Sequence, residues 1–147
     1  MVRPMRPVSY VNFHRGGSLR CETLVLTCID FRFRKQVAEL LMHAGYRDFD
    51  ILALPGASHA LVRNESRDTA LNSIELSVRL HGVKRLIIVD HEDCGTCGGS
   101  AAFHSTEEEE KFHTSSLQSA VKLVHAKFPH LEVIATYMDW QQIRQVV

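Results

Sequence analysis

Short apolar runs, rich in β-branched residues, alternate along the chain with stretches of helical periodicity. Apolar runs of this length predict buried strands. We expect strands over residues 23–27, 50–54, 85–90 and 131–137. The third run is the most strongly apolar, which predicts that its strand is central in the sheet.

Between these runs, apolar residues recur three or four positions apart, which predicts amphipathic helices. The first helix is expected over 33–44 and ends at Gly45. The second is expected to begin with Asp68 as its N-cap and to end at Gly82. The last carries its apolar side chains on one face and ends at Pro129; these side chains are Leu117, Val121, Val124 and Phe128.

The alternation of strands and helices predicts an α/β fold with three layers. Right-handed crossovers between such strands give a mainly parallel sheet flanked by helices. We expect the strand order 2-1-3-4, which places the first and third strands side by side. Ligands of such sheets bind beyond the carboxyl ends of the strands, where the strand order reverses.

The first 20 residues differ from the rest of the chain. They contain prolines, glycines and four arginines without one acidic residue, and they lack a core pattern. We expect residues 1–20 to form an irregular basic arm, and residues 21–147 to form a single zinc-binding domain.

The polar run Glu107–Glu110 stands before the last predicted helix, with His104 and His113 on either side of it. Runs of one charge are most simply solvated. We therefore expect the glutamate run to be a solvated polar face ahead of the last helix.

The charge balance limits the kinds of partner. Seventeen basic residues match seventeen acidic ones, so we expect neither nucleic acid nor an anionic membrane surface as a partner. No apolar run approaches the roughly 20 residues that span a bilayer, and the first residues lack the apolar stretch of a secretory signal. We expect a cytoplasmic protein that binds a small molecule or another copy of itself.

Three residues with metal-binding side chains fall at the ends of predicted neighbouring strands. Cys28 ends the first strand, and His91 and Cys94 follow the third. Thiolate and imidazole are ligands of zinc, and a catalytic zinc keeps three protein ligands and an open fourth position. The pattern predicts a zinc site at this edge of the sheet.

Asp30 and Arg32 follow Cys28 at alternate positions, so an extended backbone would turn all three side chains to one side. An aspartate beside the metal can accept a hydrogen bond from water, and an arginine can hold that aspartate ionised. Alternatively, Asp30 binds the metal itself and closes the site.

The runs Cys28–Arg32 and His91–Gly95 together resemble the two signatures of β-class carbonic anhydrases. The resemblance extends to 73–75 and 82–84 and covers residues 22–137. It implies zinc on Cys28, His91 and Cys94 and a catalytic dyad of Asp30 and Arg32.

The resemblance also implies a zinc lyase that hydrates carbon dioxide reversibly to bicarbonate. Zinc-bound hydroxide would be the nucleophile, oriented by Asp30, which Arg32 holds. Family members usually carry an Arg-Asn-Ala-Gly type loop after the second strand, where this chain has 54–58, Leu-Pro-Gly-Ala-Ser. We expect Gly56, Ala57 and Gly95 to line the substrate pocket, and the chain to form a homodimer or a higher homo-oligomer.

Other interpretations of these residues are a non-catalytic zinc protein of the same fold and a hydrolase of carbon disulfide or carbonyl sulfide. Cys94 and Cys97 also have the spacing of a redox pair or of half a four-cysteine site. Cys21 and Cys28 would complete the latter, but a strand between them would hold them about 20 Å apart.

Overall fold

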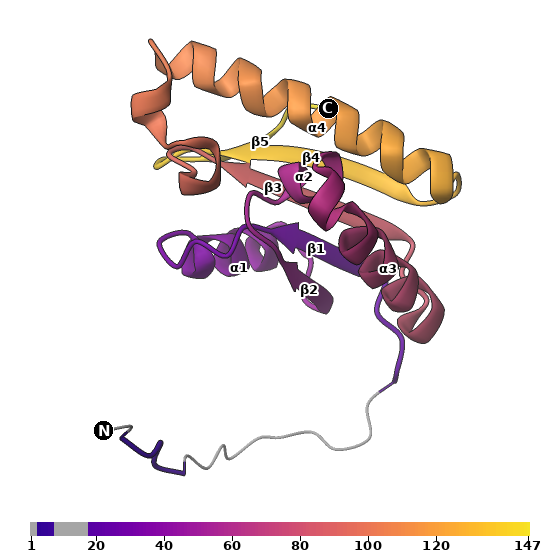
Figure 1. Ribbon diagram of the computed structural model, residues 1–147. Helices are drawn as coiled ribbons and strands as arrows, with labels where there is room; N and C mark the ends of the chain where they lie inside the picture. The colour runs from indigo at the N-terminus through magenta and orange to yellow at the C-terminus, as the bar shows by residue number, and fades with distance from the viewer. Residues whose placement is uncertain (1–2, 8–17) are drawn as a thin grey trace.

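The structure is a computed structural model that describes residues 3–7 and 18–147, and within them the strands form one sheet in the order β2-β1-β3-β4-β5 (Figure 1). The first four strands are parallel, which confirms the predicted order 2-1-3-4 and the α/β fold class. Their bounds are Thr23–Thr27 for β1, Phe49–Ala53 for β2, Arg85–His91 for β3 and Glu132–Met138 for β4.

Helices cover both faces of this sheet (Figure 1). Helix α1 (Arg34–His43) packs on one face, against Val25 and Ile87. Helices α2 (Ser58–Val62), α3 (Asn64–His81) and α4 (Thr106–Lys127) pack on the other. Alternate residues of each strand therefore enter two separate apolar cores.

The strand register aligns the carboxyl ends of the central strands. Thr27, the last residue of β1, pairs with Ala53 of β2 and with Val89 of β3. The residues that follow β1 therefore lie beside the end of β3, and this is the switch point where ligands bind in parallel sheets.

The second half of the chain departs from the predicted element bounds. Helix α3 begins at Asn64 after Arg63, so the prediction that Asp68 caps this helix is wrong. The short helix α2 was not predicted. It precedes α3, and its buried residues Ala60 and Leu61 pack into the core.

The glutamate run Glu107–Glu110 belongs to the first turns of α4, so the prediction that it stands ahead of this helix is wrong, although Glu107 and Glu108 are exposed as expected. Ser105 caps the helix by accepting a hydrogen bond from the Glu108 N–H at 3.1 Å. Glutamates at this position interact favourably with the helix dipole. Glu109 and His113 turn inward and are almost fully buried.

Strand β5 (Ile143–Gln145) was not predicted either. It is three residues long and pairs antiparallel to β4, so the sheet is mixed. Its register is set by pairing with the edge of β4, which a three-residue pattern does not reveal.

Of the predicted basic arm, residues 3–7 and 18–20 are exposed and lie outside helices and strands. Residues 1–2 and 8–17 of that arm lie outside the described residues. Within residues 3–7 and 18–147, no helix is both long and apolar enough to cross a membrane.

Candidate metal centre

The structure brings together Cys28, His91 and Cys94. Cys28 follows β1, His91 ends β3, and Cys94 lies in the turn after β3. One ligand atom of each residue lies within 4.8 Å of the other two. Two thiols and an imidazole at this spacing match the donor set and the size of a tetrahedral zinc site.

His91 is oriented as a metal ligand. Its ring is buried, and Nδ1 lies 2.6 Å from the carbonyl oxygen of Glu92, so Nδ1 carries the proton and donates it. Nε2 therefore presents a lone pair, and it has no hydrogen-bond partner among the described residues. A buried acceptor without a partner is costly, and a cation between this nitrogen and the two thiols would satisfy it.

The two thiols are held close together. A hydrogen bond with Cys94, together with burial, raises the pKa of Cys28 to about 12. The Gly56 N–H points to the sulfur of Cys28 at 3.4 Å. Metal binding requires the thiolate, so an arriving cation would displace the thiol protons. The donor set fits zinc.

Asp30 and Arg32 form a fork-to-fork pair beside this cluster. Arg32 Nε donates to Asp30 Oδ1 at 3.0 Å, and Arg32 Nη2 donates to Asp30 Oδ2 at 2.6 Å. This pairing, led by the Arg32 hydrogen bonds, holds the pKa of Asp30 below its usual value. Asp30 Oδ2 lies 3.8 Å from His91 Nε2, at the edge of the candidate site.

A turn, and not an extended backbone, places this pair. Strand β1 ends at Thr27, and the Arg32 backbone N–H donates to Asp30 Oδ1 at 2.9 Å, which closes the chain around the aspartate. The two side chains therefore meet at one edge of the cluster by local hydrogen bonding.

Arg32 has a second carboxylate partner, Asp93, which was not predicted as a site residue. Arg32 Nη1 donates to Asp93 Oδ2 at 2.8 Å. Asp93 has a left-handed backbone (φ 57°), and its N–H donates to the buried Glu109 at 2.6 Å. Gly99 has a positive φ of 73°, which favours glycine, and a Cβ there would lie 3.0 Å from Asp93 Oδ1 and press against this carboxylate. The loop after β3 thus fixes the arginine.

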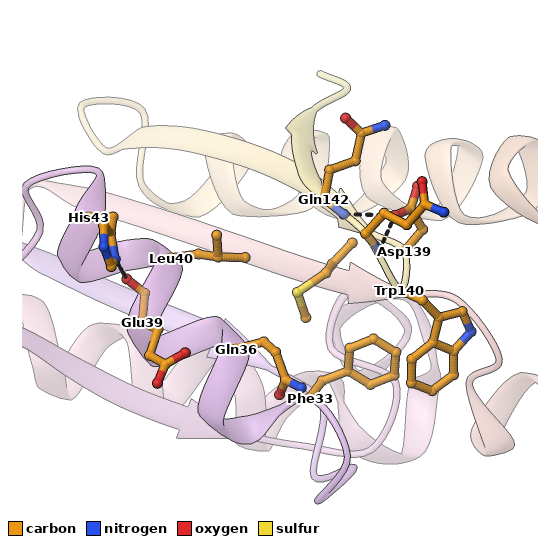
Figure 2. A pocket seen from close by; sticks show the side chains of 10 residues that line it. Phe33, Gln36, Glu39, Leu40, His43, Asp139, Trp140 and Gln142 are labelled. Atoms are coloured by element: carbon orange, nitrogen blue, oxygen red, sulfur yellow. Dashed lines mark hydrogen bonds between the residues drawn. The ribbon is translucent and has the colours of Figure 1, made fainter.

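Aromatic side chains border the same cluster. The buried ring of Phe33 lies 4.4 Å from the His91 ring and 4.5 Å from the ring of Trp140, between centroids. Figure 2 shows Phe33 and Trp140 side by side at one end of a groove of about 420 Å³ between α1 and the turn after β4. The groove lies next to the metal candidate, and the Phe33 ring connects the two.

The three residues expected to line the substrate pocket occupy different environments. Gly56 has a positive φ of 80° and presents its N–H to Cys28. Ala57 is fully buried, and its N–H donates to the Leu54 carbonyl oxygen, so this amide does not face the cluster. Gly95 is exposed, with open space around its Cα.

The remaining cysteines lie at opposite ends of the sheet. Cys21 precedes β1, and its thiol hydrogen-bonds the carbonyl oxygen of Thr23, so the structure separates it from Cys28 by the length of the strand. Cys97 lies in the short 3₁₀ turn η1 (Gly95–Cys97), where Cys94 is its neighbour. The four cysteines therefore do not share one site.

A family model described as "Putative carbonic anhydrase" matches residues 19–147. An uncharacterized protein of Rickettsia bellii is 36% identical over 123 residues, which cover 79% of this chain and 75% of that protein. An uncharacterized protein of Rickettsia conorii is 31% identical over 138 residues, covering 89% of this chain and 74% of that protein.

Solved structures share the fold. A β-carbonic anhydrase isoform of Trichomonas vaginalis superposes with a TM-score of 0.63 at 14% identity, covering 92% of this chain and 87% of that one. A tetrameric β-carbonic anhydrase of Sordaria macrospora superposes with a TM-score of 0.62 at 15% identity, covering 88% and 81% of the two chains.

Proposed function

Because this chain belongs to that carbonic anhydrase family, we propose that it hydrates carbon dioxide reversibly to bicarbonate with a zinc ion held by Cys28, His91 and Cys94. The observation that carries the proposal is the unpartnered His91 Nε2, which lies in the candidate site with the two thiols. Zinc, when bound, is a Lewis acid that lowers the pKa of water to near neutrality.

Asp30 has the position and charge to orient the reacting water. Its carboxylate is kept ionised by Arg32, and Oδ2 lies 3.8 Å from His91 Nε2. An ionised carboxylate there accepts a hydrogen bond and fixes the direction of the oxygen lone pairs. Arg32 is a positioning residue, because its guanidinium is engaged by Asp30 and Asp93.

The test is a stopped-flow hydration assay on zinc-loaded protein. Cys94→Ala removes a donor, and we expect the rate to fall by at least about 10³-fold, since metal-ion catalysis supplies several kcal/mol. Cys21→Ala is the matched control, because this cysteine lies at the other end of β1; it should keep the parent rate. Failure of the zinc-loaded parent to hydrate carbon dioxide between pH 6 and 9 would reject the proposed activity.

We also propose that the chain works as a homo-oligomer. Ile51, Leu76 and Leu80 are exposed and line one groove between the edge strand β2 and α3. An exposed apolar patch next to an unpaired edge strand is a common site of self-association. Light scattering should give a mass above 16.7 kDa that Leu80→Glu lowers; an unchanged mass would place the interface elsewhere.

A further inference from the structure

A second cluster of metal-binding side chains lies around Asp90, near the end of β3. His59 of α2, Cys97 of η1 and His113 of α4 each place one ligand atom within 4.8 Å of the others. Both histidines are buried, and the carboxylate of Asp90, at the end of β3, is buried against them. No member of this cluster belongs to the candidate zinc site.

The spacing of the nitrogen and oxygen atoms in this cluster is close to that of a tetrahedral metal site. His59 Nε2 lies 3.2 Å from His113 Nδ1 and 3.5 Å from Asp90 Oδ2, and the last two atoms lie 3.0 Å apart. Zinc bonds of 2.0–2.2 Å to nitrogen and oxygen place tetrahedral ligands about 3.3–3.5 Å apart. One ion could therefore contact all three atoms after small shifts.

A chain of serines fixes the tautomer of His59. Ser58 has one hydroxyl proton, which it donates to Asp90 Oδ2 at 2.6 Å. Ser116 must therefore donate to Ser58 across their 2.8 Å contact, and the Ser116 oxygen accepts from His59 Nδ1 at 3.1 Å. Nδ1 thus carries the proton of the neutral ring, so His59 Nε2 presents its lone pair. Such an outer partner typically orients a metal-bound histidine.

Two acceptors, His59 Nε2 and Asp90 Oδ2, therefore face each other across 3.5 Å in a buried space. His113 Nδ1 lies within hydrogen-bonding distance of both acceptors, at 3.2 Å from His59 Nε2 and 3.0 Å from Asp90 Oδ2, but a single Nδ1 proton cannot fully satisfy both. The Nε2 atom of the same ring has no hydrogen-bond partner among the described residues. Acceptors that point at one another repel unless a positive centre lies between them.

From this geometry we propose a second site for a divalent transition metal of the zinc class, bound by His59, His113, Asp90 and Cys97. The ionised Asp90 and Cys97 would balance the charge of the ion. Nitrogen, oxygen and thiolate donors in a tetrahedron are typical of zinc. The ion would join α2, β3, η1 and α4, which carry its four ligands. It would lie beside the first site because Cys97 contacts Cys94.

Cobalt(II) titration of the metal-free full-length chain tests this site without an activity assay, since cobalt(II) absorbs visible light when tetrahedrally bound. The parent should bind two equivalents. Cys28→Ala removes a donor of the first site only, and His59→Gln removes a donor of the second only, so each should bind one. The double variant should bind none.

The parent, the two single variants and the double variant also distinguish an absent second site from an absent zinc site of the proposed function. One equivalent in the parent that Cys28→Ala abolishes and His59→Gln leaves intact would overturn the second site. One equivalent with the opposite response would support the second site and reject the first. Cys97→Ser should lose the same equivalent as His59→Gln. Its thiolate-to-cobalt absorption band should be weaker than that of the parent, because only the thiolates of the first site remain.

Folding of each variant is checked by circular dichroism and by its urea unfolding midpoint before titration. His104→Gln is the matched control, because His104 is an exposed histidine near the start of α4. It should keep both equivalents. Loss of an equivalent in this control would show that the titration reports surface binding, and this result would overturn the assignment.

Discussion

Polar side chains are exposed to water at one end of the parallel sheet and buried at the other. At the amino end, polar groups pair where water reaches them: Lys84 with Glu22, Arg85 with Glu132, and Asp50 with Ser77 and His81. At the carboxyl end, the polar side chains are buried among the ends of the strands and helices; these are Asp90, His91, Glu109 and His113.

The difference lies in how completely the polar groups are satisfied. The pairs at the amino end are surface ion pairs and hydrogen bonds, and each contributes about 1 kcal/mol or less. At the carboxyl end, two buried imidazole nitrogens, of His91 and His113, have no hydrogen-bond partner among the described residues. Each such atom costs about 1–3 kcal/mol. The apolar cores offset that cost, so the carboxyl end can keep the unpaired His91 Nε2 beside the two thiols of the candidate zinc site.

Among substitutions that keep the three proposed zinc ligands, the largest expected effect comes from Asp30→Asn at the carboxyl end. The asparagine keeps the shape of the side chain but loses its charge and the two-oxygen pairing with Arg32. We expect the hydration rate to fall by about 10²–10³-fold with zinc content unchanged, because Asp30 is not among the three clustered ligands. Stopped-flow assays and metal analysis of the same preparation measure both quantities.

Two outcomes would contradict this prediction. A parent-like rate would remove Asp30 from the mechanism. A loss of zinc together with the rate would make Asp30 a metal ligand. Asp50→Asn, an aspartate at the amino end of β2, is the matched control and should leave the hydration rate unchanged.

An intermediate effect is expected from Glu109→Leu. This substitution tests whether the buried Glu109 carboxylate stabilises the loop after β3. Glu109 accepts the Asp93 N–H at 2.6 Å and the Ser100 hydroxyl at 2.8 Å. Leucine would leave the Asp93 N–H without its acceptor, so we expect a loss of about 2–3 kcal/mol in the free energy of unfolding. Urea unfolding measures this loss.

Glu107→Gln is the control for this substitution, because it changes an exposed glutamate in the same helical turn. It should shift the free energy of unfolding by less than about 0.5 kcal/mol. Equal stability of Glu109→Leu and the parent would show that the buried carboxylate does not support the loop.

The four parallel strands were predictable from the sequence because each is a short apolar run bounded by turn residues, and both features are local. The same holds for Cys28 and His91, because residues that follow neighbouring parallel strands meet at one edge. The roles of Cys28, His91, Cys94, Asp30 and Arg32 remain predictions, as do the pocket assignments of Gly56, Ala57 and Gly95.

The second cluster could not be predicted from the sequence, and the reasons are physical. His113 stands among glutamates, and its burial depends on how α4 packs against the end of β3. His59 belongs to α2, a five-residue helix without its own periodic signal. The Asp93 backbone, with φ at 57°, depends on the turn that Gly99 and Glu109 stabilise. Each feature results from tertiary contacts and leaves no local pattern.

The smallest expected effect is on stability, from Asp50→Asn at the amino end. Burial opposes ionisation of Asp50, but hydrogen bonds from Ser77 at 2.5 Å and His81 at 2.7 Å outweigh it and lower the pKa of this carboxyl. A pKa that is lower in the folded than in the unfolded chain stabilises the fold above the unfolded value, and this contribution is lost as the pH falls through the folded value. We therefore expect Asp50→Asn to cost about 1 kcal/mol at pH 7 and progressively less below pH 4. Urea unfolding of parent and variant at pH 7, 5 and 3 measures the difference, and a difference that grew towards acid pH would show that the hydrogen bonds favour the protonated carboxyl.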